Sequence, residues 1–137
     1  MRRLSLAAAI VTLGALVLAG SAQACSCAQM APGEAIQRAD AAIVGELIEV
    51  VPRDAGRADY RYRVQRVYKR GPGISREATI SVRSAMDSAG CGLPHRTGRR
   101  YGLLLVRGEG RWSGGLCGLL RPRQLDSAAQ RRFHCAS

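Results

Sequence analysis

The sequence predicts an all-β domain with flanking helices, in which five short strands form a Greek-key barrel of the OB type. Several short segments alternate apolar with polar residues, turn-forming residues separate them, and the two longest change phase or contain glycine. Residues 25–137 are sufficient for one domain with a modest core. We find no internal repeat and no low-complexity segment.

The first predicted element is a short helix over 32–40, because Pro32 suits a first helical turn and the apolar residues that follow share one side. A polar loop over 52–59, a turn over 70–73 and a loop over 84–90 separate the strands that follow. The predicted strands cover residues 41–51, 60–68, 78–83, 100–107 and 112–117.

Two of these strands are expected to bend. Gly45 interrupts the first, which suggests a bulge or a sharp bend, and the alternation of the second shifts phase at Val67, which suggests a bulge. A closing helix is predicted over 125–133, with Asp126 or Ser127 as its N-cap.

Residues 1–24 have the pattern of a secretory signal peptide: Arg2 and Arg3, an apolar stretch, and the small-residue cleavage site Ala22-Gln23-Ala24. Cleavage after Ala24 makes Cys25 the first residue of an exported domain over 25–137, periplasmic or extracellular. Two alternatives stay open. The stretch could be retained as a membrane anchor, or Cys25 could be lipidated, which is the one way in which we expect contact with the membrane.

All five cysteines lie after the predicted cleavage site: Cys25, Cys27, Cys91, Cys117 and Cys135. Export places them in an oxidising compartment, where disulfides persist. The Cys-x-Cys spacing is too short for a usual zinc knuckle, and no nearby His completes one. We therefore expect disulfides, with one cysteine left over because the count is odd.

The chain is strongly basic, with a net charge of +11 that becomes +9 once Arg2 and Arg3 are removed. Such a charge suits an anionic polymer, but the arginines are scattered, which favours a solvated surface. Trp112 and the tyrosines are expected in the core rather than stacked on bases, so no specific recognition of nucleic acid is predicted. Lys69 is the single lysine, a bias typical of a high-GC bacterial genome.

Catalysis by this chain is not expected. His95 and His134 belong to no metal or nucleophile motif, and the ten carboxylates form no paired-acid pattern. We predict neither an enzyme nor a cofactor.

Eight pieces of sequence, taken in order, carry a family resemblance: CSCA at 25–28, RAD at 38–40, VYKRG at 67–71, CG at 91–92, GRRY at 98–101, LC at 116–117, QL at 124–125 and Gln130. The set resembles the inhibitory N-terminal domain of the tissue inhibitors of metalloproteinases, within the netrin-like domain group, and predicts a bacterial member. The resemblance implies disulfides Cys25–Cys91 and Cys27–Cys117. It leaves Cys135 without a partner, because Gln37 stands at the family's remaining cysteine position.

The resemblance also implies a function. The backbone amine and carbonyl of Cys25 would bind the catalytic zinc of a target metalloprotease, and the side chain of Ser26 would enter the adjoining substrate pocket. The residues implied to contact the protease are Cys25, Ser26, Cys27, Ala28, Gln29, Ala89 and Gly90.

Departures from the family pattern keep a second function open. Gln29 stands where the animal inhibitors carry Pro, Ala89-Gly90 is small for a contact loop, and the loop between the first two strands is short. The alternative is a non-inhibitory extracytoplasmic binding module on the same barrel, for an anionic polymer or a partner protein. The sequence predicts no oligomeric state.

Overall fold

The computed structural model describes residues 25–134 and confirms the predicted fold class. No helix in this range is both long and apolar enough to cross a membrane. The elements in chain order are α1 (Pro32–Arg38), β1 (Ala41–Pro52), β2 (Arg57–Lys69), β3 (Thr79–Ala85), β4 (Arg100–Gly108), β5 (Arg111–Ser113), the 3₁₀ helix η1 (Leu116–Gly118), β6 (Leu119–Leu120) and α2 (Pro122–His134).

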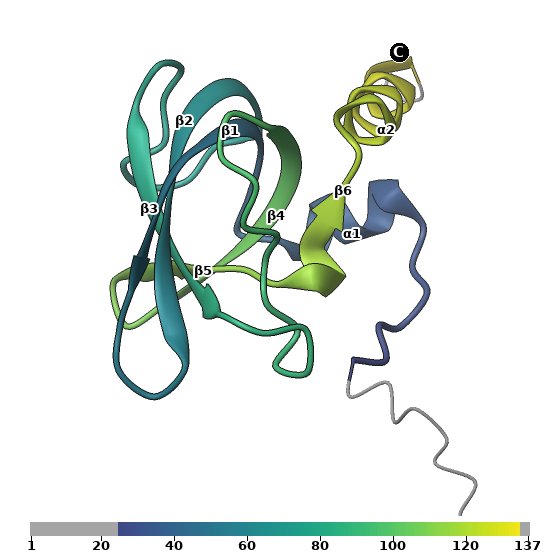
Figure 1. Ribbon diagram of the computed structural model, residues 1–137. Coiled ribbons are helices and arrows are strands. Elements are labelled where there is room, and N and C mark those ends of the chain that lie inside the picture. Colours follow the sequence, from purple (N-terminus) through teal and green to yellow (C-terminus); the bar gives the residue numbers. More distant parts are fainter. Residues whose placement is uncertain (1–24, 135–137) are drawn as a thin grey trace, which may run out of the picture.

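Five strands close into a barrel in the order β1-β2-β3-β5-β4, and pairing of β1 with β4 completes the ring (Figure 1). β3 and β5 run parallel, whereas the other neighbours in the barrel are antiparallel. The short strand β6 pairs with β4 and leads into α2. This is the five-stranded barrel of the OB type that the sequence predicts.

The strand β1 has to bend, because it pairs with β2 along its whole length and with β4 through its first half. Its register with β2 shifts at three places, one of them between Val44 and Gly45. A Cβ atom on Gly45 would lie 3.1 Å from Cβ of Tyr62, so a larger residue would crowd the bend. Across this shift β2 skips Gln65, and across the first it skips Tyr68, next to Val67, so the bulge predicted in the second strand is confirmed. The residue that β1 skips is Ile48, three positions after Gly45.

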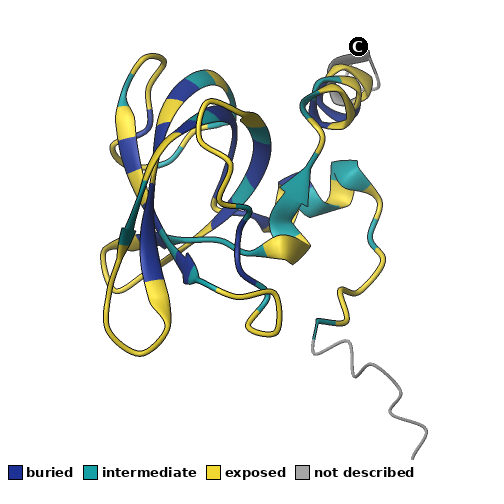
Figure 2. Cartoon of the chain, viewed as in Figure 1, coloured by how far each residue is buried: buried dark blue, intermediate teal, exposed yellow. Residues whose placement is uncertain are grey.

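The barrel interior is the main core (Figure 2). Tyr60, Tyr62 and Trp112 are buried in it, which confirms the expected core role of these three aromatic residues. A second apolar cluster places both helices on the outer side of β1, and its members are Ile36, Ala42, Val44, Leu125 and Ala128.

The prediction for the fifth strand was too long. β5 ends at Ser113, and Cys117 lies in the 3₁₀ helix η1 rather than in a strand. The cause is a change of hydrogen-bond partner, because the backbone N–H of Leu116 donates to the carbonyl of Cys91 at 2.8 Å instead of continuing the ladder. The strand β6 after it was not predicted.

The predicted start of the closing helix was also wrong. α2 begins at Pro122, whose ring pre-sets the first helical turn, and the side chain of Gln124 accepts a hydrogen bond from the N–H of Arg121 at 3.0 Å. The predicted caps have other partners. Asp126 binds Tyr68 and Arg66, and the Ser127 hydroxyl donates to the carbonyl of Arg123.

Two further boundaries differ by a few residues. The loop predicted over 52–59 is a turn over 53–56, because β2 already begins at Arg57. Ala55 and Gly56 both adopt positive φ in this turn, at 58° and 66°, which lets the hairpin reverse tightly. At the other end of β1, α1 stops at Arg38, two residues before the predicted boundary.

Candidate functional site

The segment over 25–31 contains no helix or strand and is joined to the barrel by two disulfides. Cys25 is bonded to Cys91 and Cys27 to Cys117, with Cα–Cα separations of 5.5 and 5.2 Å. These are the pairings that the family resemblance implies, and disulfides are compatible with an exported protein. We call residues 25–29 the N-terminal ridge. Bridges at alternate residues hold it at two points, so its backbone does not behave as a free chain end.

The loop that carries Cys91 is a tight turn held by its own hydrogen bonds. The Asp87 carboxylate accepts from the N–H of Gly90 at 2.5 Å, and its backbone carbonyl accepts from the N–H of Gly92 at 2.9 Å. Cys91 has a φ of 59°, in the left-handed region that non-glycine residues seldom adopt. The turn therefore presents the Cys91 sulfur in one fixed direction.

Gly92 is required by close backbone packing. A Cβ atom at this position would collide with the carbonyl oxygen of Ala85 and lie 2.8 Å from that of Asp87. Only glycine lets the chain leave the turn beside the end of β3.

The two cysteines that receive the ridge are held against each other by the backbone. Besides the bond from Leu116 to the Cys91 carbonyl, a Cβ atom on Gly115 would lie 2.7 Å from that same carbonyl oxygen. The turn that carries Cys91 and the 3₁₀ helix that carries Cys117 are thus in direct contact. Both bridges consequently attach the ridge to one rigid part of the barrel.

His95 braces the same loop although its side chain is exposed. Its Nε2 lies 2.6 Å from the Met86 carbonyl, a spacing that requires a proton on this nitrogen, and 3.2 Å from the Tyr60 hydroxyl. The Tyr60 hydroxyl donates to the carbonyl of Ala85 at 3.0 Å. Burial, with a smaller contribution from Asp87, raises the pKa of Tyr60, so this hydroxyl keeps its proton. No sequence motif predicts this contact between β2 and the loop.

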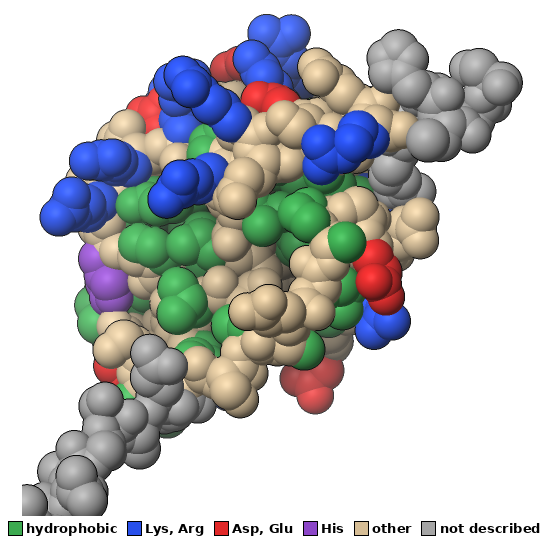
Figure 3. All heavy atoms as spheres, turned by 90° about the vertical axis from the view of Figure 1, so that its right-hand side faces the viewer, with side chains coloured by type: hydrophobic (Ala, Val, Ile, Leu, Met, Phe, Trp, Pro, Cys, Tyr) green, Lys and Arg blue, Asp and Glu red, His purple; other side chains and the backbone are tan. Residues whose placement is uncertain are grey.

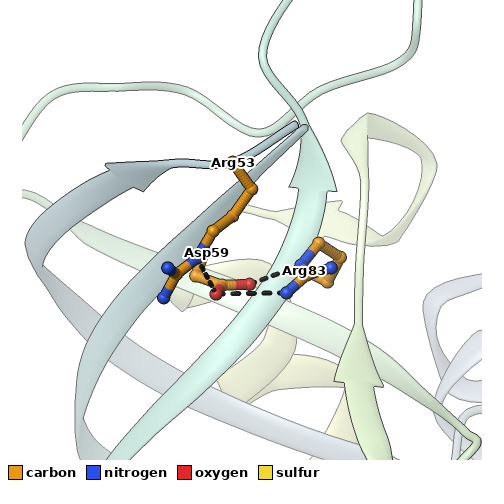
Figure 4. A network of polar contacts seen from close by, with 3 residues as sticks. All are labelled: Arg53, Asp59 and Arg83. Carbon is orange, nitrogen blue, oxygen red and sulfur yellow. Dashed lines mark hydrogen bonds and ion pairs between the residues drawn. The ribbon is translucent and has the colours of Figure 1, made fainter. Parts of the chain in front are cut away.

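An ion network centred on the buried Asp59 braces β3 shortly before the loop begins (Figure 4). Asp59, which is 8% exposed, lies opposite Arg83 in the β2–β3 register and accepts two hydrogen bonds from its guanidinium, at 2.5 and 3.2 Å. Arg53 donates a third at 2.7 Å. The hydrogen bond from Arg83, followed by that from Arg53, lowers the pKa of Asp59 against the opposing effect of burial.

A mainly apolar groove of about 500 Å³ lies next to the ridge. Ala28 of the ridge and Met30 just after it form one side, and Val106, which is 55% exposed, belongs to β4. The remaining lining residues come from α1, β4 and the two cysteine-bearing segments: Ala35, Arg38, Ala39, Cys91, Leu104, Ser113, Gly114, Gly115, Cys117 and Gly118. The groove therefore extends the ridge into a wider surface that a partner could cover.

The residues implied to contact a protease are accessible. Ser26, Cys27, Ala28 and Gln29 are exposed, and so are Ala89 and Gly90 in the loop. Cys25 is partly buried at its disulfide. Because Cys25 is bonded to Cys91, the 89–90 segment directly precedes one of the two residues that anchor the ridge. Gly90 is also held by the Asp87 carboxylate, which restrains this small segment.

The remaining candidate groups are metal-binding side chains and the unpaired cysteine. Within residues 25–134 no group of three or more His, Cys, Asp or Glu side chains is placed to hold a metal ion. The candidate unpaired cysteine, Cys135, lies outside the described residues.

Comparison with known proteins leaves the family undecided: no family model matches the chain, and no curated protein is significantly similar to it in sequence. The site has to be interpreted from its own geometry.

Proposed function

We propose that the protein, once cleaved after Ala24, inhibits zinc metalloproteases through its N-terminal ridge, as the tissue inhibitors of metalloproteinases do. The observation that carries this proposal is the pair of disulfides at alternate residues, Cys25–Cys91 and Cys27–Cys117. Structural bridges alone would not need to converge on one short, exposed segment.

The chemistry follows from which atoms of Cys25 remain available. Its sulfur is bonded to Cys91 and cannot bind a metal ion. After cleavage its α-amine and carbonyl oxygen are two donors that close a five-membered ring on one ion. A catalytic zinc has three protein ligands and an open position occupied by water. The two donors would displace that water, and with it the nucleophile that the protease needs.

Rigidity of the ridge supports tight binding. A segment that is already ordered loses little conformational entropy when it docks. The ridge is held at two points, and its anchors contact each other through the Leu116–Cys91 hydrogen bond. The neighbouring apolar groove would add buried surface around the chelated zinc.

The test uses the protein exported with its own leader, assayed against a panel of zinc metalloproteases. One Ala inserted between Ala24 and Cys25 displaces the amine while keeping both bridges, as non-reducing peptide mapping would verify. We expect inhibition to weaken by at least about a hundredfold, because the loss of a chelating contact is worth on the order of 3 kcal/mol.

A matched variant, Ser26→Ala, keeps the amine and alters only the side chain offered to the substrate pocket. It should retain most of the inhibition. Equal inhibition by the Ala-extended and native proteins would contradict chelation, and failure against the whole panel would contradict the inhibitory function.

A further inference from the structure

A second and larger hollow, of about 1150 Å³, lies between the segment that enters β4 and the segment that leads from β6 into α2. Its most prominent lining residues are six arginines: Arg66, Arg96, Arg99, Arg100, Arg121 and Arg123. We call this hollow the arginine cleft. Figure 3 shows Lys and Arg side chains gathered along the upper edge of the face that carries β6 and α2, above an apolar area.

Five of these six arginines have no acidic partner. Asp126, the carboxylate that lines the cleft, is taken by the Arg66 guanidinium at 2.8 Å and by the Tyr68 hydroxyl. The other five guanidiniums have no carboxylate within 4.0 Å in the part of the chain that the structure describes, which contains all ten Asp and Glu residues. All five side chains are exposed.

Clustered charges of one sign repel each other and attract counter-ions. Elsewhere in the described fold some arginines pair with a carboxylate, as Arg38 does with Glu34, whereas others, such as Arg57 and Arg111, have no carboxylate within 4.0 Å. The cleft differs in that five unpaired arginines line one hollow, and the first turn of α2 adds the positive end of a helix dipole with no acidic residue in that turn. The local field therefore favours an anionic ligand.

The arrangement of the arginines in the cleft limits the class of anionic ligand that it can bind. Arg96, Arg99 and Arg100 approach from the β4 side and Arg121 and Arg123 from the α2 side, so the charges are spread rather than focused on one point. A guanidinium binds carboxylate or sulfate through two parallel hydrogen bonds. Such an array suits a chain that carries several anionic groups.

The cleft is poorly equipped for nucleic acid. Single-stranded nucleic acids are held largely by bases stacked on several aromatic side chains. Tyr101 is the aromatic residue among those that line the cleft, and its ring already meets the edge of Tyr62, with centroids 6.4 Å apart. We infer that the arginine cleft binds an acidic polysaccharide, through guanidinium contacts with carboxylate or sulfate groups along the chain.

The test measures binding of the exported protein to four probes: heparin as a sulfated chain, polygalacturonate as a carboxylated chain, dextran as a neutral chain, and single-stranded DNA. The cleft variant is Arg99→Gln with Arg123→Gln, one change on each side. The matched control is Arg57→Gln with Arg111→Gln, which removes the same charge from two exposed arginines outside the cleft. Each affinity is measured over a range of salt concentrations.

We expect one or both acidic chains to bind and dextran not to bind. The cleft variant should lower the affinity about tenfold and reduce the salt slope by about two, whereas the control should change affinity less than about twofold. The relative affinity for heparin and polygalacturonate identifies sulfate or carboxylate as the preferred group.

Three results would overturn the inference: no binding to either acidic chain, equal losses in the cleft variant and the control, or tighter binding of DNA than of both polysaccharides. Neither variant alters the N-terminal ridge. Protease inhibition therefore succeeds or fails independently of this test.

Discussion

Replacing Cys27 and Cys117 by Ser removes one bridge and leaves the other, and the structure sets the size of the effect. The bridges close loops with sequence separations of 66 and 90 residues, but they share most of that length. With Cys25–Cys91 intact, the chain from Cys27 to Cys117 is already shortened to about 30 residues through the remaining bridge. The chain-entropy relation then gives a loss of about 3.6 kcal/mol, rather than the roughly 4.6 kcal/mol of an isolated loop of that span.

Loss of either bridge should cost the same. If Cys25 and Cys91 are replaced by Ser instead, the remaining path runs through Cys27–Cys117 and has the same effective length. Each double variant should therefore lower the unfolding free energy by about 3.6 kcal/mol, or the melting temperature by roughly 15 °C for a domain of this size.

Urea unfolding without reductant measures both losses directly, and removal of all four cysteines provides the reference. That variant should lose about 8 kcal/mol, comparable to the whole stability of a small domain. A loss below about 1 kcal/mol for either bridge, or a difference above about 2 kcal/mol between them, would refute the shared-loop argument.

Three further results are expected. Asp59→Asn should lower the unfolding free energy by about 2 kcal/mol, because Arg83 loses its charged partner. Since the pKa of Asp59 is lowered in the folded state, urea unfolding at a series of pH values should show the full difference from wild type above about pH 4 and its loss as the pH falls through the folded pKa. Gly92→Ala should cost about 2–3 kcal/mol in thermal unfolding, whereas Gly108→Ala, with nothing within 4 Å of the new Cβ, should stay within about 0.5 kcal/mol. Inhibition through the Cys25 amine should strengthen by up to about fiftyfold from pH 6 to pH 8, after correction for the protease's own profile, because an ordinary α-amine has a pKa of about 8 and binds metal only when neutral.

Much of the barrel could be predicted because its signals are local. The phase change at Val67 indicated the bulge in β2, since a residue that interrupts an alternating pattern displaces the ladder. The burial of Tyr60, Tyr62 and Trp112 followed from their strand positions. The two disulfides came from the ordered family motifs rather than from spacing alone.

What the sequence did not reveal depends on contacts between distant segments. The strand predicted to reach Cys117 ends early because Leu116 bonds to a carbonyl 25 positions away, and no local pattern encodes that partner. The arginines of the cleft belong to three separate stretches and were interpreted as scattered. Only the fold brings Arg66, Arg96 and Arg123 to one hollow.

The central claim is that export leaves Cys25 as a free amino terminus fixed against the barrel. Mass spectrometry of the N-terminal peptide from the exported protein, digested without reductant, tests it most directly. We expect a peptide that begins at Cys25, carries an unmodified α-amine and is linked through Cys25 to the peptide that contains Cys91. A lipid, an acetyl group or a retained Ala24 on that terminus would contradict it, and so would a bridge from Cys25 to Cys27 or Cys135.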